Sequence, residues 1–339
     1  MAIPNIYQII SCSSDLVQSG RNVDLWGRVI AVFPFCIYVK STTGKIVCIV
    51  DKALDNGPGR VRMDFLTPHR LRVEDGDRVT SRGKDVYLGD SAIARNNQAT
   101  IWSPPSINSL GVRDGILGTM RWLLKQLEKD IPTGGLSSVL ISTEDIATGS
   151  APNQHGCDTV VSLGIPAIRD LALGWSAADR YTISKGVAQL IGLGPGLTPS
   201  GDDLLSGVLV ALKQIQKIDP KFVGNLATEM LASEVARYAP GGTNVISGAM
   251  LFHAIKGNSI CSVHCLLMDL FNSTSSIRTT KFAKDVVAIG HTSGWDTLAG
   301  LFLGLHLWLH KVGIATTSVL PSKLFKDASS WSRRVVESQ

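Results

Sequence analysis

The sequence lacks the features that mark secreted and membrane-spanning proteins. Its six cysteines form no C-x-x-C pair and show none of the spacing of a secreted disulfide framework, which predicts reduced thiols and a cytoplasmic protein. The N-terminal residues have neither a basic start nor a long apolar run, so no signal peptide is evident. The most apolar segment, 298–309, is too short for a bilayer and contains His306, which indicates a buried helix and no membrane partner.

Charge is also scarce. Only 18% of the 339 residues are Asp, Glu, Lys or Arg, and the net charge is +5. The basic residues are dispersed, and Arg333-Arg334 is interpreted as part of a solvated tail, so nothing indicates a nucleic-acid partner. With 44% hydrophobic residues, the composition is typical of a compact globular protein, and the length allows two domains with a sizeable core.

Two common site patterns are missing as well. G-x-S-x-G occurs nowhere, which argues against a Ser-His-Asp nucleophile elbow. Cys261, His264 and Cys265 lie within about one helical turn, but no second ligand pair follows at zinc-site spacing. That cluster favours a buried helix face, with a metal site as the alternative.

The first part of the chain contains short β-branched runs separated by Gly, Pro, Asn and Asp. Thr42-Thr43-Gly44 and Asp75-Gly76-Asp77 are typical of turns between strands. Strands this short and closely spaced predict a small antiparallel barrel or sandwich over residues 1–105, with its boundary at Pro104-Pro105.

Helical spacing replaces the strand pattern after that boundary. We therefore expect an α+β protein in which residues 106–320 form a mainly helical domain and 321–339 a C-terminal tail. Residues 137–153 are ambiguous and are where a loop over the site could lie. The expected helices cover residues 112–127, 167–173, 177–190, 200–218, 220–238, 246–255, 259–271, 281–289 and 297–312.

One stretch, I-G-L-G-P-G-L-T-P-S-G-D-D-L-L-S-G-V-L-V-A at 191–211, organises the helical part. Its first half combines four glycines with two prolines, which cannot continue a regular element and force a tight loop. Ser200 and Asp203 have the S-x-x-D spacing of a capping box, which predicts that the loop opens directly onto a helix N-terminus. Such a terminus presents unpaired N–H groups and a positive dipole end to a ligand.

A second stretch repeats this device. Residues 291–300, H-T-S-G-W-D-T-L-A-G, share the pattern S-G-x-D-x-L-x-G with residues 200–207 without a gap. Two ordinary helix starts are the alternative, because S-x-x-D is a common cap. A cap does not explain Gly201, Gly294 or the glycines inside the helices, which need a packing or functional reason. We predict two matching helix starts that face one another across a single site.

These two motifs resemble the AllH family, as does a third polar loop at 240–247 in which Thr243 and Ser247 match a family pattern. The resemblance covers roughly residues 20–312. It implies a β-rich N-terminal part and the third subunit of an oxamate carbamoyltransferase, which exchanges a carbamoyl group between oxalurate and phosphate in anaerobic allantoin breakdown. It also implies partner subunits, one of them similar to an acyl-CoA synthetase. Asn244 departs from the family, where a second Thr or Ser is often present.

Carbamoyl transfer requires donors for charge on the carbamoyl oxygen and phosphate, and acceptors for the carbamoyl NH₂ group. The candidate donors are the backbone N–H groups of residues 194–201 and 294–295, and the candidate acceptors are Asp202, Asp203 and Asp296. Carboxylates at a helix start compete with phosphate for the same positive potential. Either Mg²⁺ bridges them, or the carboxylates hold an amide while phosphate binds elsewhere. No other cofactor is indicated.

Capping does not explain Asp202, which favours a functional role for it. His291 is a candidate proton carrier or positive donor, with a structural loop histidine as the alternative. Arg180 and Lys185 are candidate phosphate partners, with ordinary surface charges as the alternative. The predicted catalytic residues are Asp202, Asp203, His291 and Asp296. The residues predicted to bind carbamoyl phosphate or an oxamate-like amide are Gly194, Gly196, Thr198, Ser200, Gly201, Thr243, Asn244, Ser293 and Gly294.

Two other functions stay open at this point. One is a Mg²⁺-dependent hydrolase in which Asp202 and Asp203, together with Asp296, act as hard oxygen ligands. The other is a non-catalytic subunit whose loops bind a partner protein.

Overall fold

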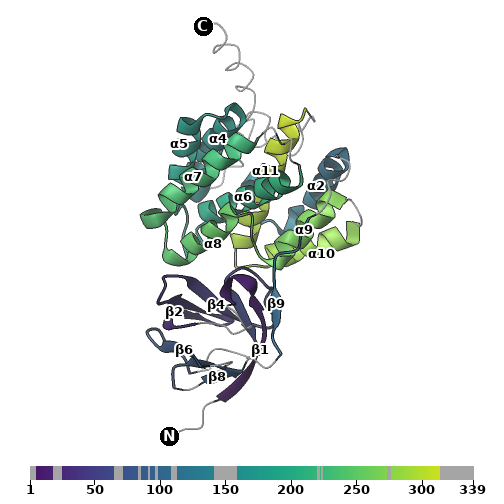
Figure 1. Ribbon diagram of the computed structural model, residues 1–339. Helices are drawn as coiled ribbons and strands as arrows, with labels where there is room; N and C mark the ends of the chain where they lie inside the picture. The colour runs from purple at the N-terminus through teal and green to yellow at the C-terminus, as the bar shows by residue number, and fades with distance from the viewer. Residues whose placement is uncertain are drawn as a thin grey trace. The chain divides into compact units, whose positions relative to one another are not determined.

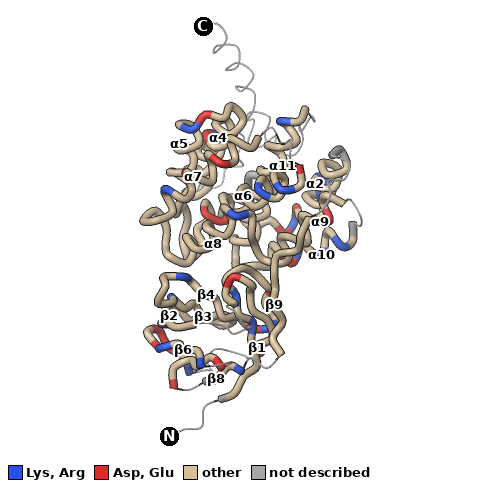
Figure 2. The backbone as a smooth tube through the Cα atoms, in the orientation of Figure 1, with Lys and Arg blue, Asp and Glu red and all other residues tan. Residues whose placement is uncertain are grey.

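The computed structural model describes residues 5–17, 25–64, 72–82, 85–90, 92–95, 98–107, 113–140, 159–219, 222, 224–272 and 276–313. The chain divides into two compact units (Figure 1). The barrel unit is Met1–Pro105 with Asn258–Cys261, and the helical unit is Ser106–Gly257 with Ser262–Gln339. In each unit, basic residues are interspersed with acidic ones along the backbone (Figure 2). The predicted tail at 321–339, and residues 141–153 of the predicted site loop, lie outside the described residues.

The barrel unit is built from short strands. They are β1 (Asn5–Ser13), β2 (Gly27–Phe33), β3 (Cys36–Ser41), β4 (Ile46–Asp51), β5 (Arg60–Met63), β6 (Arg78–Arg82), β7 (Asp85–Leu88), β8 (Ala92–Arg95) and β9 (Thr100–Trp102). The strand order is β5-β4-β3-β2-β6-β7-β8-β1, and pairing of β1 with β5 closes it into a barrel. β9 adds to β1 beyond β8. The predicted turns are confirmed at Gly44 and Gly76, which both have positive φ.

The expectation of a purely antiparallel sheet is wrong in part. β1 runs parallel to β8 and β9, and β4 runs parallel to β5, while the remaining pairs are antiparallel. The sequence between β4 and β5 explains one of these cases, since residues 52–59 carry the chain back to the same end of the sheet before β5 begins. Alternate side chains such as Ile37, Val39 and Ile49 fill the barrel interior.

The helical unit follows the expected periodicity. Its helices are α2 (Arg113–Leu127), α4 (Thr159–Ala177), α5 (Arg180–Leu190), α6 (Ser200–Ile218), α7 (Asn225–Gly242), α8 (Val245–Ile255), α9 (Cys261–Asn272), α10 (Ser276–Val287) and α11 (Ser293–Lys311). Short 3₁₀ turns lie at Glu128–Asp130 and Ser137–Leu140. Within the described residues, the helices do not combine the length and the apolarity that crossing a membrane requires.

α6 and α11 form the centre of the helical unit, with α4, α5 and α7 to one side and α2, α9 and α10 to the other (Figure 1). Both central helices are buried along most of their length, including the predicted apolar segment that contains His306. Burial on every face explains why α11 is apolar all round instead of amphipathic. The two repeated motifs therefore begin the two most buried helices of this unit.

Candidate functional site

α6 and α11 cross in direct backbone contact at Gly207 and Gly300. A Cβ atom on Gly207 would overlap the Thr297 carbonyl oxygen, and one on Gly300 would overlap the Leu204 carbonyl oxygen. Thr297 occupies the same place in the second motif as Leu204 does in the first. Such reciprocal contacts are what a local two-fold axis produces. The predicted pairing of the two motif helices is therefore confirmed.

The segments that lead into these helices are also alike. Gly201 packs so closely on the Leu190 carbonyl of α5 that a Cβ would overlap it, and Gly294 packs in the same way on the Val286 carbonyl of α10. The connection is tight in both cases, with Gly194 and Gly290 at positive φ. Each motif glycine is thus required for close approach of a helix start to the end of the preceding helix.

The N–H groups of these two glycines are not available to a ligand. The Gly201 N–H donates to the Leu193 carbonyl at 2.9 Å, and the Gly294 N–H donates to the Ile289 carbonyl at 2.9 Å. Because the loops themselves use these donors, these two N–H groups of the expected donor set are not free to stabilise an oxyanion.

The predicted capping boxes are wrong as well. Pro199 and Thr292 are the N-cap residues of α6 and α11, and neither makes a side-chain capping bond. Ser200 and Ser293 are instead the first helical residues. The physical reason is that each serine hydroxyl is directed to the opposite helix.

The serines and carboxyls of the two motifs are exchanged between the helices. Ser293 of α11 hydrogen bonds to the Asp203 carboxyl of α6, and Ser200 of α6 hydrogen bonds to the Asp296 carboxyl of α11. Both contacts favour the ionised carboxyl and so lower its pKa. The Thr198 hydroxyl lies 2.7 Å from the Ser293 hydroxyl and completes the link between the loop and α11.

Burial has the larger and opposite effect on both carboxyls. Asp203 is 8% exposed and Asp296 is 0% exposed. Loss of hydration raises the pKa of Asp203 well above its usual range, and the neighbouring carboxyls of Asp296 and Asp202 raise it further. The pKa of Asp296 rises to about 6, chiefly through burial. One oxygen of each carboxyl, Oδ2, is buried without a hydrogen-bond partner.

A segment that the sequence reasoning missed covers Asp296. The Leu136 N–H donates to Asp296 Oδ1, and a Cβ on Gly135 would lie 2.6 Å from that oxygen. Gly135 has positive φ, and the Thr292 side chain lies on the same carboxyl. The only signal for this segment in the sequence is the pair Gly134-Gly135 after α2, a pattern that also indicates an ordinary helix stop.

Asp202 is placed differently from the other two carboxylates. Its Oδ1 accepts a hydrogen bond from the Gly192 N–H at 2.8 Å. Its Oδ2 accepts hydrogen bonds from the hydroxyls of Thr243 and Ser247, the latter at 2.6 Å. Asp202 thus ties the first glycine loop to the third loop, and these three donors explain it without a ligand.

The third loop supports the first one through Asn244. Its Oδ1 caps α8 by accepting from the Ile246 and Ser247 N–H groups, both at 3.0 Å. Its side-chain amide donates to the Leu197 carbonyl at 2.8 Å. A Thr or Ser at this position would cap the helix but could not also reach out with an amide donor. The departure from the family pattern therefore has a structural use in this chain.

The remaining predicted residues line the exposed side of the loops. Gly196 and His291 are exposed, and Thr198 is half-buried. Gly196 has positive φ and open space at its Cβ position. Of these residues, Thr198 contacts the carboxyl pair through a hydrogen bond to Asp203.

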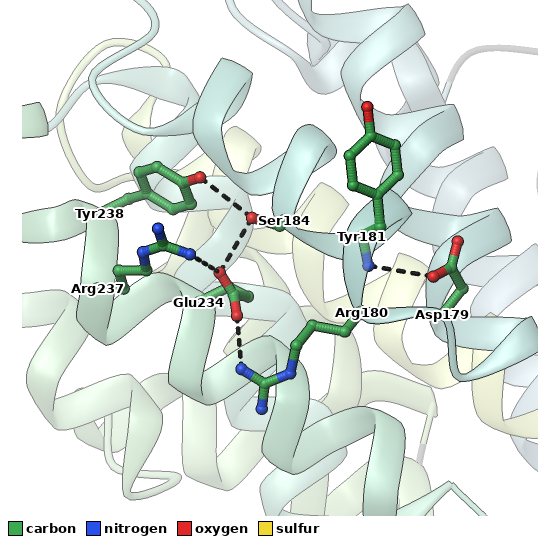
Figure 3. A network of polar contacts seen from close by, with 7 residues as sticks. All are labelled: Asp179, Arg180, Tyr181, Ser184, Glu234, Arg237 and Tyr238. Atoms are coloured by element: carbon green, nitrogen blue, oxygen red, sulfur yellow. Dashed lines mark hydrogen bonds and ion pairs between the residues drawn. The ribbon is translucent and has the colours of Figure 1, made fainter.

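The two candidate phosphate partners have carboxylate partners of their own. Arg180 pairs with the buried Glu234 at 2.8 Å, and Lys185 pairs with Asp170 at 2.9 Å. Glu234 also accepts from the Ser184 hydroxyl at 3.0 Å and lies 3.6 Å from Arg237 (Figure 3). The network joins α5 to α7 and does not include the motif residues.

A metal-binding role finds no geometric support in the described part of the chain. No group of three or more His, Cys, Asp and Glu side chains there is arranged to hold an ion. His264 lies buried in α9, and loss of hydration lowers its pKa to about 4. Of the three residues expected to form a buried helix face, His264 fits, whereas Cys261 and Cys265 are only partly buried.

The segment of the sequence that contains the site matches a known protein family. Residues 190–305 match the family model described as oxamate carbamoyltransferase subunit AllH. The matched range is about a third of the chain, begins at the end of α5 and ends within α11, so it contains both motifs and the third loop. The resemblance inferred from the motifs is confirmed over this range. No solved structure matches the chain.

Proposed function

We propose, from the match of residues 190–305 to the AllH family, that this chain is a subunit of a carbamoyltransferase of the oxamate type. Its substrates are oxalurate or oxamate and carbamoyl phosphate, and it works in the cytoplasm with partner subunits that include an acyl-CoA-synthetase-like protein. Its place is in nitrogen and purine catabolism, through allantoin. The site is the carboxyl pair Asp203 and Asp296 with the loops around it.

The observation that carries the proposal is the pair of unpartnered oxygens. A carbamoyl group presents a C=O acceptor beside an NH₂ donor, so it is complementary to one protonated and one ionised carboxyl. Asp203, whose pKa burial and the adjacent carboxyls raise well above the usual range, keeps its proton and donates to the carbonyl. Asp296, whose pKa is raised to about 6, is ionised at neutral pH and accepts from the NH₂ group.

The same pair is unsuited to phosphate. Two carboxyls repel an incoming dianion, and the Gly201 and Gly294 N–H groups are already bonded within the loops. The phosphate part of carbamoyl phosphate therefore lies away from the pair, against the exposed Gly196, the half-buried Thr198 and His291, or on a partner subunit. This placement separates the recognised carbamoyl group from the leaving group.

The test is a transfer assay with the chain and its partner subunits. Phosphate-dependent conversion of oxalurate into oxamate and carbamoyl phosphate is measured for the wild type, Asp203→Asn and Asp296→Asn. Loss of a preorganised polar contact to the reacting group lowers turnover by about 10²–10³-fold. Asp170→Asn is the matched control, because its carboxylate pairs with an exposed lysine outside the site.

The outcomes separate the remaining readings. Wild-type turnover in both site variants contradicts the proposal. Unchanged turnover combined with weaker assembly of the subunits supports the non-catalytic, partner-binding reading instead. A third outcome, loss of activity in Asp170→Asn as well, marks a general failure of folding and is distinguished by the melting temperature.

A further inference from the structure

The outer face of the barrel carries two cysteines on neighbouring strands. In the antiparallel pair of β3 and β4, Cys36 lies opposite Val50 and Tyr38 lies opposite Cys48. Cys36 and Cys48 are therefore diagonal neighbours on one face. Cys48 lies beside Arg60 of the parallel strand β5. The residues between them, such as Ile37 and Ile49, point into the barrel core, so this cluster faces outward.

The two thiols are in contact. Cys36 and Cys48 share a hydrogen bond between their sulfur atoms, and the Tyr38 hydroxyl hydrogen bonds to both. The Tyr38 ring is itself held edge-on against Phe33, with the ring centres 6.1 Å apart. The phenol is thereby fixed over the sulfur pair.

The two thiols differ in their surroundings. Cys36 is partly exposed, whereas Cys48 is 7% exposed. Hydrogen bonding from Cys48 lowers the pKa of Cys36, and the positive charge of Arg60 and the Tyr38 hydroxyl lower it further. The pKa of Cys48 is raised by its hydrogen bond to Cys36 and by burial. The accessible thiol is thus the better nucleophile, and the buried one lies beside it.

We propose that Cys36 and Cys48 are a redox pair that a peroxide converts into a reversible disulfide, with Cys36 as the attacking thiol and Cys48 as the resolving one. The inference is independent of the carbamoyltransferase function, because all four residues of the cluster belong to the barrel unit. The modification site lies on the barrel, whereas the glycine motifs lie in the helical unit.

The chemistry balances with the peroxide as the only oxidant. The Cys36 thiolate attacks one peroxide oxygen, an S–O bond forms as the O–O bond breaks, and water leaves with the thiol proton. Cys48 then attacks the Cys36 sulfur, an S–S bond forms, and the S–O oxygen leaves as a second water with the Cys48 proton. Two thiols lose two electrons, and one peroxide is reduced to two waters.

Cys12 provides an internal comparison in the same unit. It is 2% exposed, and burial raises the pKa of its thiol. A buried thiol with a raised pKa is inert toward peroxides and alkylating reagents. At neutral pH we expect Cys36 to react with iodoacetamide at least about tenfold faster than Cys12 in the folded, full-length chain.

The decisive experiment uses hydrogen peroxide on the reduced full-length chain, followed by alkylation of the remaining thiols and digestion with trypsin. Cleavage after Lys and Arg places Cys36 in peptide 29–40 and Cys48 in peptide 46–52, each with a single cysteine. The expected product is these two peptides linked by a disulfide, which disappears after treatment with dithiothreitol.

Two variants test the order of the steps. In Cys48→Ser, the sulfenic acid of Cys36 has no resolving thiol and is captured by dimedone on peptide 29–40. In Cys36→Ser, Cys48 stays reduced at the same dose. Arg60→Gln slows formation of the linked peptides several-fold, because the thiolate loses its cationic neighbour.

Three results would overturn the proposal. The first is no linked peptide at a dose that oxidises other cysteines of the chain. The second is linkage that forms only in urea, which would place the sulfurs apart in the folded barrel. The third is oxidation of Cys48 in Cys36→Ser at the wild-type rate, which would remove Cys36 from the attacking role.

Discussion

Gly207 and Gly300 face each other at the point where α6 and α11 cross. A Cβ on Gly207 would lie 2.9 Å from the carbonyl carbon of Gly300, and one on Gly300 would lie 3.0 Å from the Cα of Gly207. The neighbouring atoms are backbone atoms on both sides, so no side chain can move aside. The two helices that carry the carboxyl pair are therefore held together by main chain.

Gly207→Ala should force these helices apart. We expect the free energy of unfolding to fall by on the order of 1–3 kcal/mol, because the added methyl group overlaps backbone. Urea denaturation measures the change. Gly118→Ala is the matched control: Gly118 is an exposed helical glycine with open space at its Cβ position, so alanine there should stabilise by about 0.5–1 kcal/mol. Equal effects of the two substitutions would refute the close contact.

The stability of the chain should depend on pH through Asp296. Its folded-state pKa is raised to about 6, so the folded state binds more protons than the unfolded state between about pH 4 and pH 6. Stability contributed by the protonated carboxyl is therefore lost as the pH rises through that window. The loss is on the order of 3 kcal/mol and is constant at higher pH.

Asp296→Asn should remove this dependence, because the amide does not ionise. The measurement compares urea midpoints of the wild type and the variant at several pH values. We expect the wild type to lose stability relative to the variant from about pH 4 to pH 6. Parallel curves for the two proteins would show that Asp296 keeps an ordinary pKa.

Asp202→Ala should release the first glycine loop from the third loop. The substitution leaves the Gly192 N–H and two hydroxyls without their acceptor, which costs about 1–3 kcal/mol for a buried donor. Hydrogen exchange at the Gly192 amide should become faster, which detects the released loop directly. Ser247→Ala removes one donor and keeps the acceptor, so its Gly192 amide should exchange at the wild-type rate.

Glu234→Gln tests the network between α5 and α7. Glu234 is 1% exposed and faces two arginines, so the neutral amide should lower the free energy of unfolding by about 1–3 kcal/mol. Lys185→Met, also in α5, breaks the pair between the exposed Lys185 side chain and Asp170 of α4. That control should leave the melting temperature unchanged. An equal loss of stability in both variants would mean that the burial of Glu234 adds nothing to the stability of the network.

Much of the helical unit could be predicted because its signals are local. The periodicity of residues 200–218 gave both ends of α6, and the shared motif spacing predicted the pairing of α6 with α11. The parallel pairing of β1 with β8 and β9 could not be predicted, since it depends on partners far away in the sequence. α4 also extends past Pro166, which a sequence pattern would treat as a break.

The contacts of the candidate site residues differ from those that the sequence patterns indicate. Asp202 was predicted to be functional because capping does not explain it, but its carboxylate accepts hydrogen bonds from three protein donors, which account for it. The S-x-x-D spacing predicted that each serine caps its own helix, yet each serine hydroxyl bonds to the carboxyl of the other helix. The hydrogen bond from Leu136 to Asp296 joins residues 160 positions apart, and no local pattern carries such a contact.

Because Gly207 and Gly300 fix the spacing of α6 and α11, the loops that precede these helices can change in length without moving the helices. Seven residues run from Gly194 to Ser200 in the first motif, but only four from Gly290 to Ser293 in the second, and the reciprocal contacts of the helices are the same on both sides. The spacing of the carboxyl pair is therefore independent of loop length. Insertions and deletions in the loops can therefore alter the surroundings of the pair while the pair itself keeps its geometry.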